Sequence, residues 1–193
     1  MAPRQGAGRS WLCAYPICKK ALMERAQGSI HASVILEEYG DYECPMSARA
    51  HDLIGELLDT FGTQVRFVFR NFPLSEHAHA ERAAQAAESA GEQGKFWEMQ
   101  NLLFRNPGRL RLVDLVDYAE RLGLDVERFE EELTNHAHMG EVAHDLHEGR
   151  RRGVRGTPEF FINGARYEGP IVLEPLREAI QSALDQELIR RAI

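Results

Sequence analysis

The most constraining feature of this 193-residue sequence is an apolar strand pattern that runs, through one cysteine and one proline, into a helix pattern. Residues 34–39 are mostly apolar and partly β-branched, which predicts a largely buried strand closed by Gly40. Pro45 suits the first position of a helix, and apolar residues keep helical spacing up to Phe61. Residues 65–69 alternate apolar and polar side chains and predict a second strand. A helical crossover of this kind makes the two strands parallel.

The rest of the chain predicts a helical insertion followed by a hairpin and a closing helix. Between residues 75 and 153 only helix patterns occur. Asn163-Gly164 then favours a tight hairpin turn, and residues 173–189 carry apolar residues on one helical face. The order βαβ, helices, ββα predicts an α/β fold with an all-helical insertion. We expect residues 1–32 to form a partly disordered extension with a short helix at 21–27. Residues 33–74 form the first half of the α/β domain, residues 75–153 the helical insertion, and residues 154–193 the second half of the α/β domain.

Composition and charge restrict the partners and the compartment. With 44% hydrophobic and 27% charged residues, the chain is expected to fold as one soluble domain without a membrane span. Its net charge of -7 leaves no basic field for nucleic acid. Three cysteines are too few for a disulfide scaffold, and the apolar stretch 11–18 lacks the order of a secretory signal. We therefore expect a cytoplasmic protein; its oligomeric state is left open.

Cys44 is the candidate nucleophile. It falls at the predicted start of a helix, where unpaired N–H groups and the helix dipole favour a thiolate over a neutral thiol. A free cysteine can equally be a small buried apolar residue, and position alone does not separate the two interpretations. Pro45 next to it favours an exposed, reactive turn.

Four blocks of sequence, in consistent order, carry a family resemblance. Residues 40–45 (GDYECP), 65–74 (VRFVFRNFPL), 83–104 (AAQAAESAGEQGKFWEMQNLLF) and 153–164 (GVRGTPEFFING) resemble the DsbA-like thioredoxin domains, including those fused to sodium/proton antiporters. The resemblance extends from about residue 33 to residue 184. It implies a thioredoxin fold and a thiol-disulfide oxidoreductase.

The resemblance also assigns roles to individual residues. Cys44 would be the attacking cysteine, in a catalytic turn that includes Pro45. Thr157-Pro158 would be a cis-proline loop that lies against Cys44 and, with Met46, contacts a bound peptide. Glu38 matches a buried acidic residue that tunes the thiol, although Glu37 beside it could occupy the inward position instead.

The sequence departs from the family at the second active-site cysteine. The usual C-P-x-C is Cys44-Pro45-Met46-Ser47 here, so one sulfur is present, and Ser47 cannot resolve a mixed disulfide. Three explanations stay open. An external thiol such as glutathione resolves the Cys44 adduct while Ser47 donates a hydrogen bond to the thiolate; Cys13 and Cys18 form a second redox pair; or Ser47 is an engineered substitution.

Two other functions are compatible with these residues. One is a glutathione-dependent transferase or isomerase of the kappa type, which uses a similar fold with a serine in the active-site turn. The other is a peptide-binding module without turnover. The histidines are expected on solvated helix faces, so we predict no metal site and no cofactor beyond glutathione as resolving thiol. The expected partners are protein or peptide thiols and disulfides.

Overall fold

A five-stranded mixed sheet lies at the centre of the computed structural model, which describes residues 25–192. Its spatial order is β1 (Ala26–Gln27), β3 (Val65–Asn71), β2 (Val34–Gly40), β4 (Glu159–Ile162) and β5 (Ala165–Arg166). β2 and β3 are parallel, as the βαβ pattern predicts, and the other neighbouring strands are antiparallel. β2 is therefore paired along both of its edges.

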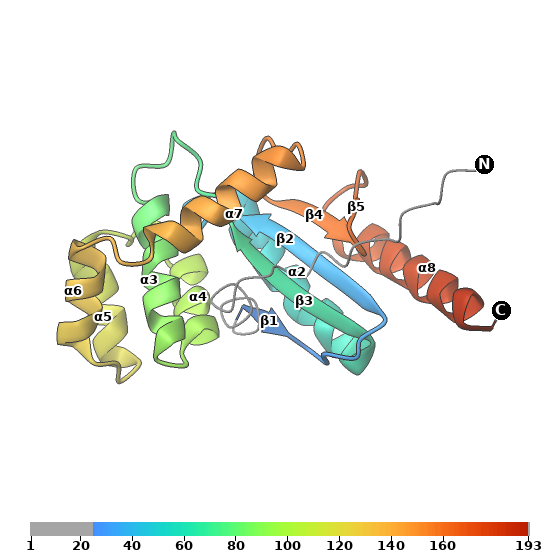
Figure 1. Ribbon diagram of the computed structural model, residues 1–193, viewed down its shortest axis with the longest axis horizontal. Helices are drawn as coiled ribbons and strands as arrows, with labels where there is room; N and C mark the ends of the chain where they lie inside the picture. Colours follow the sequence, from blue (N-terminus) through green and yellow to red (C-terminus); the bar gives the residue numbers. More distant parts are fainter. Residues whose placement is uncertain (1–24, 193) are drawn as a thin grey trace, which may run out of the picture.

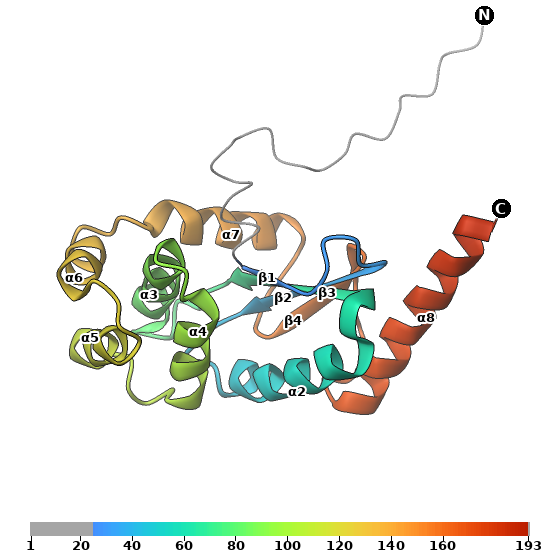
Figure 2. The ribbon, with the colours of Figure 1, turned by 90° about the horizontal axis from the view of Figure 1, so that it is seen from below.

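Helices cover both faces of this sheet. α2 (Pro45–Phe61), which the short turn η1 (Gly62–Gln64) joins to β3, and α8 (Leu173–Ala192) pack on one face, while α7 (Met139–Arg151) crosses the other (Figures 1 and 2). Side chains of β2 alternate between the two faces. Leu36 joins the large core under α2, and Tyr39 joins a smaller cluster with Phe72 and Phe161 under α7. β2 thus buries side chains on both of its faces, which fits the apolar residues at both alternating sets of positions.

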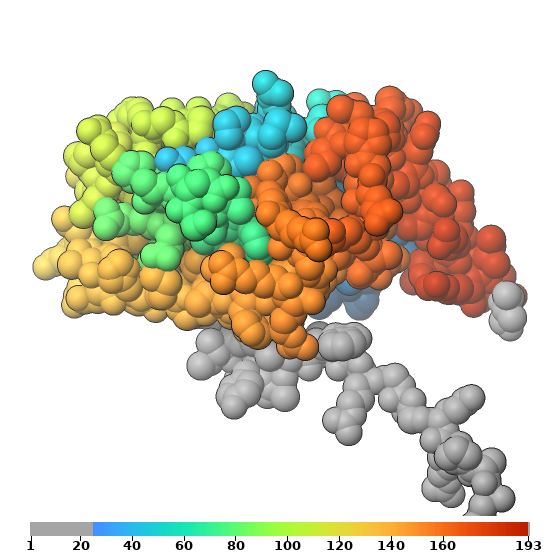
Figure 3. Space-filling view, turned by 90° about the horizontal axis from the view of Figure 1, so that it is seen from above, coloured from blue at the N-terminus to red at the C-terminus, as the bar shows by residue number. Residues whose placement is uncertain are grey.

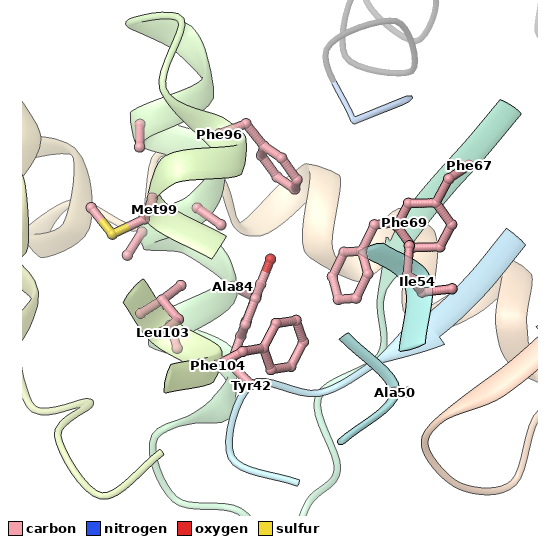
Figure 4. Close-up of a cluster of buried hydrophobic side chains, with 14 of the residues drawn as sticks. Tyr42, Ala50, Ile54, Phe67, Phe69, Ala84, Phe96, Met99, Leu103 and Phe104 are labelled. Carbon is pink, nitrogen blue, oxygen red and sulfur yellow. The ribbon is translucent and has the colours of Figure 1, made fainter. Parts of the chain in front are cut away.

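The helical insertion stands beyond the carboxyl end of β2 (Figure 1). It contains α3 (Ala80–Glu92), α4 (Phe96–Arg105), α5 (Leu112–Arg121) and α6 (Val126–Thr134) before α7 returns across the sheet. Alanines line the buried face of α3 and let neighbouring helices approach closely. Tyr42, Phe69 and Phe104 meet where the insertion joins the sheet, with ring centroids of Tyr42 5.4 Å from Phe69 and 4.7 Å from Phe104 (Figure 4). The insertion and the sheet consequently share one apolar core.

The hairpin forms where the sequence predicts it, and the chain's first described element differs from the prediction. Asn163 and Gly164 have φ of 48° and 83° in the turn between β4 and β5. The predicted helix over 21–27 is wrong at its last two residues, because Ala26 and Gln27 form β1 and pair with Val68 and Phe67. An unpaired edge strand leaves its backbone groups open, and β1 satisfies part of that edge of β3. The sheet therefore begins before residue 33, where we placed the start of the domain.

A buried group of charged side chains connects the first residues of the described chain to α3 and α7. Arg25 pairs with Asp145 and lies 3.0 Å from Glu88. Asp145 also accepts a hydrogen bond from the Asn71 backbone N–H at 3.0 Å, and the Asn71 side chain donates to Glu88 at 2.6 Å. Side chains of Arg25, Glu88 and Asp145 are at most 7% exposed. At Glu88 burial outweighs the pairing with Arg25 and raises the pKa to about 7, so the pairing offsets only part of the cost of removing these groups from water.

Replacing Asp145 with Asn should destabilise the protein. The variant leaves Arg25 buried with one fewer counter-charge, which should lower the free energy of unfolding by about 3 kcal/mol. Urea denaturation followed by circular dichroism measures this change. Glu148→Gln is the matched control on the same helix, because its partly exposed i,i+3 pair with Arg151 is worth less than about 1 kcal/mol. Equal losses in the two variants would contradict a special contribution of the buried group.

Candidate active site

Cys44 is the residue from which α2 starts. The active-site turn, residues 41–44, follows β2 and closes with a 3.1 Å hydrogen bond from the Cys44 N–H to the Asp41 carbonyl. Cys44 has extended backbone angles at the N-cap, and Pro45 occupies the first helical position, as the sequence predicts. The first turn of a helix presents N–H groups without intrahelical partners and the positive end of the helix dipole. The Cys44 side chain therefore lies at the amino-terminal end of the α2 dipole.

The second component is the cis-proline loop, residues 156–158, which precedes β4. The Thr157–Pro158 peptide bond is cis. The Thr157 carbonyl oxygen lies 3.2 Å from the Cys44 sulfur and accepts its S–H hydrogen bond, although 113 positions separate the two residues. Cys44 is 7% exposed, and Met46 in the first turn of α2 is 46% exposed. The thiol is thus held between a helix start and a backbone segment, with Met46 open to solvent nearby in sequence.

Three segments meet on one face of the molecule around this thiol. In Figure 3, light-blue atoms of the turn and the start of α2, green atoms of the β3–α3 loop (residues 72–79) and orange atoms of the segment after α7 adjoin one another. They come from the carboxyl end of β2, the carboxyl end of β3 and the start of β4. Because β2 and β3 are parallel, their carboxyl ends fall at the same edge of the sheet. The antiparallel β4 begins at that edge too.

Ser47 faces the interior and bonds to the turn. Its side chain is fully buried, and its Oγ accepts a 3.3 Å hydrogen bond from the Asp41 N–H. A hydrogen bond from Ser47 to the thiolate belongs to one of the three explanations that the sequence leaves open; the bond seen here is the one that Ser47 Oγ accepts from the Asp41 backbone. The spacing of three residues places Ser47 one helical turn from Cys44, where a cysteine would be in reach of the first sulfur.

The two neighbouring glutamates of β2 have opposite environments. Glu37 faces α7 and pairs with Arg152 at 2.9 Å and Arg70 at 3.4 Å. Glu38 points to the α2 side, is 1% exposed, and its Oε1 has no hydrogen-bond partner. Burial, with a smaller contribution from the negative charge of Cys44, raises the pKa of Glu38 to about 8. The inward acidic residue is therefore Glu38, and it is protonated at neutral pH.

Asp41 is a site residue that we did not single out from the sequence. Its buried carboxylate accepts hydrogen bonds from the Glu43 N–H at 2.7 Å, the Leu74 N–H at 2.8 Å and the His77 Nδ1 at 2.8 Å. The bond to Glu43, two residues on, is an Asx turn, and an aspartate directly after a strand is the sequence signal for one. The other two bonds join positions more than 30 residues apart and have no local signal.

The remaining predicted residues divide into two groups. Pro45, Met46, Thr157 and Pro158 lie in the two segments that hold the thiol. Cys13 and Cys18 fall outside the described residues, so the second redox pair stays a prediction. Among residues 25–192, no helix is both long and apolar enough to cross a lipid bilayer.

A cysteine at a helix start against a cis-proline defines the class of thioredoxin-fold thiol proteins. The family model described as Thioredoxin matches residues 20–182, and the chain belongs to this family. Among curated relatives, the Na(+)/H(+) antiporter NhaA 3 of Salinispora tropica is 43% identical over 168 residues. That match covers 86% of this chain and 26% of the antiporter, so the chain spans about a quarter of its relative's length.

Solved structures share the fold along most of the chain. Oxidised BdbD from Bacillus subtilis superimposes with a TM-score of 0.78 at 22% identity, over 86% of this chain and 94% of BdbD. A thioredoxin-like oxidoreductase from Silicibacter pomeroyi gives 0.74 at 26% identity, over 83% and 91%. Wolbachia pipientis alpha-DsbA1 gives 0.72 at 17% identity, over 86% and 93%. The predicted thioredoxin fold with a helical insertion, and the resemblance to DsbA-like proteins, are confirmed.

The raised pKa of Glu38 predicts a pH-dependent effect of Glu38→Gln on stability. Between a pKa of roughly 4.3 in the unfolded chain and about 8 in the folded protein, folding takes up a proton at Glu38, so rising pH costs the wild type stability. A neutral Gln removes this cost. The variant should therefore gain about 1.4 kcal/mol over wild type for each pH unit between 5 and 7.

Urea unfolding at pH 5, 6 and 7 measures this gain. Glu56→Gln, at an exposed position of α2, is the control and should keep a constant difference from wild type. A difference between Glu38→Gln and wild type that does not change with pH would show that Glu38 is ionised in the folded protein.

Proposed function

We propose that the protein is a thiol-disulfide oxidoreductase in which the Cys44 thiolate is the nucleophile. The observation that carries the proposal is the position of the Cys44 sulfur, at the start of a 17-residue helix and 3.2 Å from the carbonyl of the cis-proline loop. The helix start stabilises the thiolate. The loop places backbone groups beside the sulfur, where an extended peptide can add as a strand. The family and the resemblance to the Silicibacter pomeroyi oxidoreductase support this assignment.

The reaction follows from sulfur chemistry. The Cys44 thiolate attacks one sulfur of a substrate disulfide, a new S–S bond forms, and the other substrate sulfur leaves as a thiolate that takes up a proton. In an enzyme with a second cysteine, that cysteine would then attack Cys44. Ser47 has no sulfur, so the mixed disulfide persists until an external thiolate, such as that of glutathione, attacks the substrate sulfur. A disulfide between glutathione and the substrate forms, the S–S bond to Cys44 breaks, and Cys44 leaves as a thiolate. We propose that the enzyme is monothiol and that its partners are protein or peptide thiols and disulfides.

The solvent exposure of side chains near Cys44 indicates which residues can contact a substrate peptide. Met46 is 46% exposed, and Thr157 and Pro158 are partly exposed beside the buried sulfur. We propose that these three residues contact the substrate peptide. Ser47 is fully buried and bonded to Asp41, which does not favour the alternative of a transferase with an accessible serine.

Substitutions at positions 44 and 47 test the monothiol cycle. Wild type incubated with a small peptide disulfide should accumulate an equimolar adduct at Cys44 that disappears when glutathione is added. Ser47→Cys should release the peptide without glutathione and form a disulfide between positions 44 and 47. Intact-mass and peptide mass spectrometry follow each species.

Ser47→Ala is the control, because it removes the hydroxyl without adding sulfur and should keep the need for glutathione. An adduct that forms in Cys44→Ala would contradict the assignment of the nucleophile. Release of the peptide from wild type without added thiol, together with a disulfide between Cys13 and Cys18, would contradict the external resolving step.

Alkylation measures the reactivity of Cys44 directly. Roughly 0.3% of free cysteine is thiolate at pH 6, so a thiol stabilised by the helix start should react with iodoacetamide at least about tenfold faster than free cysteine there. The rate is read from the mass of the peptide that contains Cys44, which separates it from Cys13 and Cys18. A rate equal to that of free cysteine across pH 5 to 9 would remove the activated thiolate.

A further inference from the structure

The side chain of His77 reaches the active-site turn from the β3–α3 loop. Its Nδ1 lies 2.8 Å from Asp41 Oδ2, and the Asp41 side chain is fully buried while that of His77 is 23% exposed. A buried carboxylate requires hydrogen bonds or a counter-charge. In the described chain, His77 is the cationic partner of Asp41.

Asp41 connects this histidine to Cys44 and to the first turn of α2. Its Oδ1 accepts from the N–H of Glu43, its carbonyl accepts from the N–H of Cys44, and its own N–H donates to Ser47 Oγ. These bonds determine the backbone path from the end of β2 to the start of the helix. A shift of Asp41 would therefore move the N-cap residue, which is the nucleophile.

The loop that carries His77 is tied to the turn at two further points. The Leu74 N–H donates to Asp41 Oδ2 at 2.8 Å, and the Glu43 Oε2 accepts from the His79 N–H at 2.7 Å. α3 of the helical insertion begins at Ala80, directly after this loop. The loop thus joins the insertion to the active-site turn, with His77 at the centre of the contact.

The charges around His77 favour its protonated form. Asp41 and Glu43 face it from the active-site turn, and Glu76 faces it from its own loop. Burial lowers the pKa of His77, but the hydrogen bond and charge of Asp41 and the charges of Glu43 and Glu76 outweigh it and raise the pKa. The ion pair is therefore complete below pH 6.5 and is lost as the pH rises through the raised pKa.

We propose that His77 is a positioning residue for Cys44: its imidazolium, bonded to Asp41, holds the active-site turn in the geometry that stabilises the thiolate. This inference rests on the proposed function, because it concerns the reactivity of the same thiol. It assigns no contact between His77 and the substrate. The imidazolium also compensates three acidic side chains near a turn in which an anion must form.

The pH dependence of Cys44 alkylation tests the proposal. The rate with iodoacetamide is measured from pH 5 to 9 in wild type, His77→Ala and His77→Asn, by mass spectrometry of the Cys44 peptide. At pH 6, His77→Ala should react about fivefold more slowly than wild type. The rates of the variant and the wild type should converge as the pH rises through the raised pKa of His77, because the wild type then loses the same positive charge. The Asn amide keeps a neutral hydrogen bond to Asp41, so His77→Asn should be alkylated about twofold more slowly than wild type at pH 6. This difference in rate should also vanish at high pH.

His79→Asn is the matched control in the same loop, because the contact of His79 with Glu43 uses its backbone N–H. It should follow the wild-type profile. If His77→Ala does not fold by circular dichroism, His77→Asn alone decides, since it also lacks the charge. The proposal would be overturned if His77→Ala reacted at the wild-type rate at every pH. It would also be overturned if the variant were slower than wild type by a factor that does not change with pH. Wild-type Cys44 that reacts no faster than free cysteine would contradict the proposed function itself.

Discussion

Strand β2 is hydrogen-bonded along both of its edges, and this pairing sets the positions of the segments around Cys44. β3 lies parallel to β2 on one side and β4 lies antiparallel on the other, and helices cover both faces. The carboxyl end of β2 is consequently a place where the active-site turn, the β3–α3 loop and the cis-proline loop converge. Cys44 and Thr157 touch because their strands are neighbours in this sheet.

Three acidic residues at this end of the sheet have different environments. Glu37 is paired with arginines, Glu38 is buried with a pKa raised to about 8, and the buried Asp41 side chain is bonded to two backbone N–H groups and to His77. Glu37 and Glu38 are adjacent in the sequence, so the alternation of strand side chains alone separates them. Glu38, whose pKa burial raises to about 8, therefore lies on the α2 side of β2, and the Asp41 side chain lies in the turn that follows the strand.

The helical insertion is attached to the sheet by polar as well as apolar contacts. Tyr42 and Phe104 pack in the shared core, and Arg25, Glu88 and Asp145 form the buried charged group between β1, α3 and α7. A buried charge that loses its partner is costly, so this group specifies one position of α3 and α7 relative to β3. The loop that carries His77 lies between that insertion and the active-site turn.

Local sequence patterns are enough to predict the order of elements from residue 34 onward, the parallel β2–β3 pair, the hairpin turn at Asn163-Gly164 and the position of Cys44 at a helix start. These features depend on local pattern, on Pro and Gly backbone preferences and on the crossover rule, which act over a few residues. The folded structure is needed to see that residues 26–27 form a strand, that Glu38 and not Glu37 points to the α2 side, and that Ser47 bonds to Asp41. It also revealed His77, because its partner is 36 residues away and no local pattern encodes that contact.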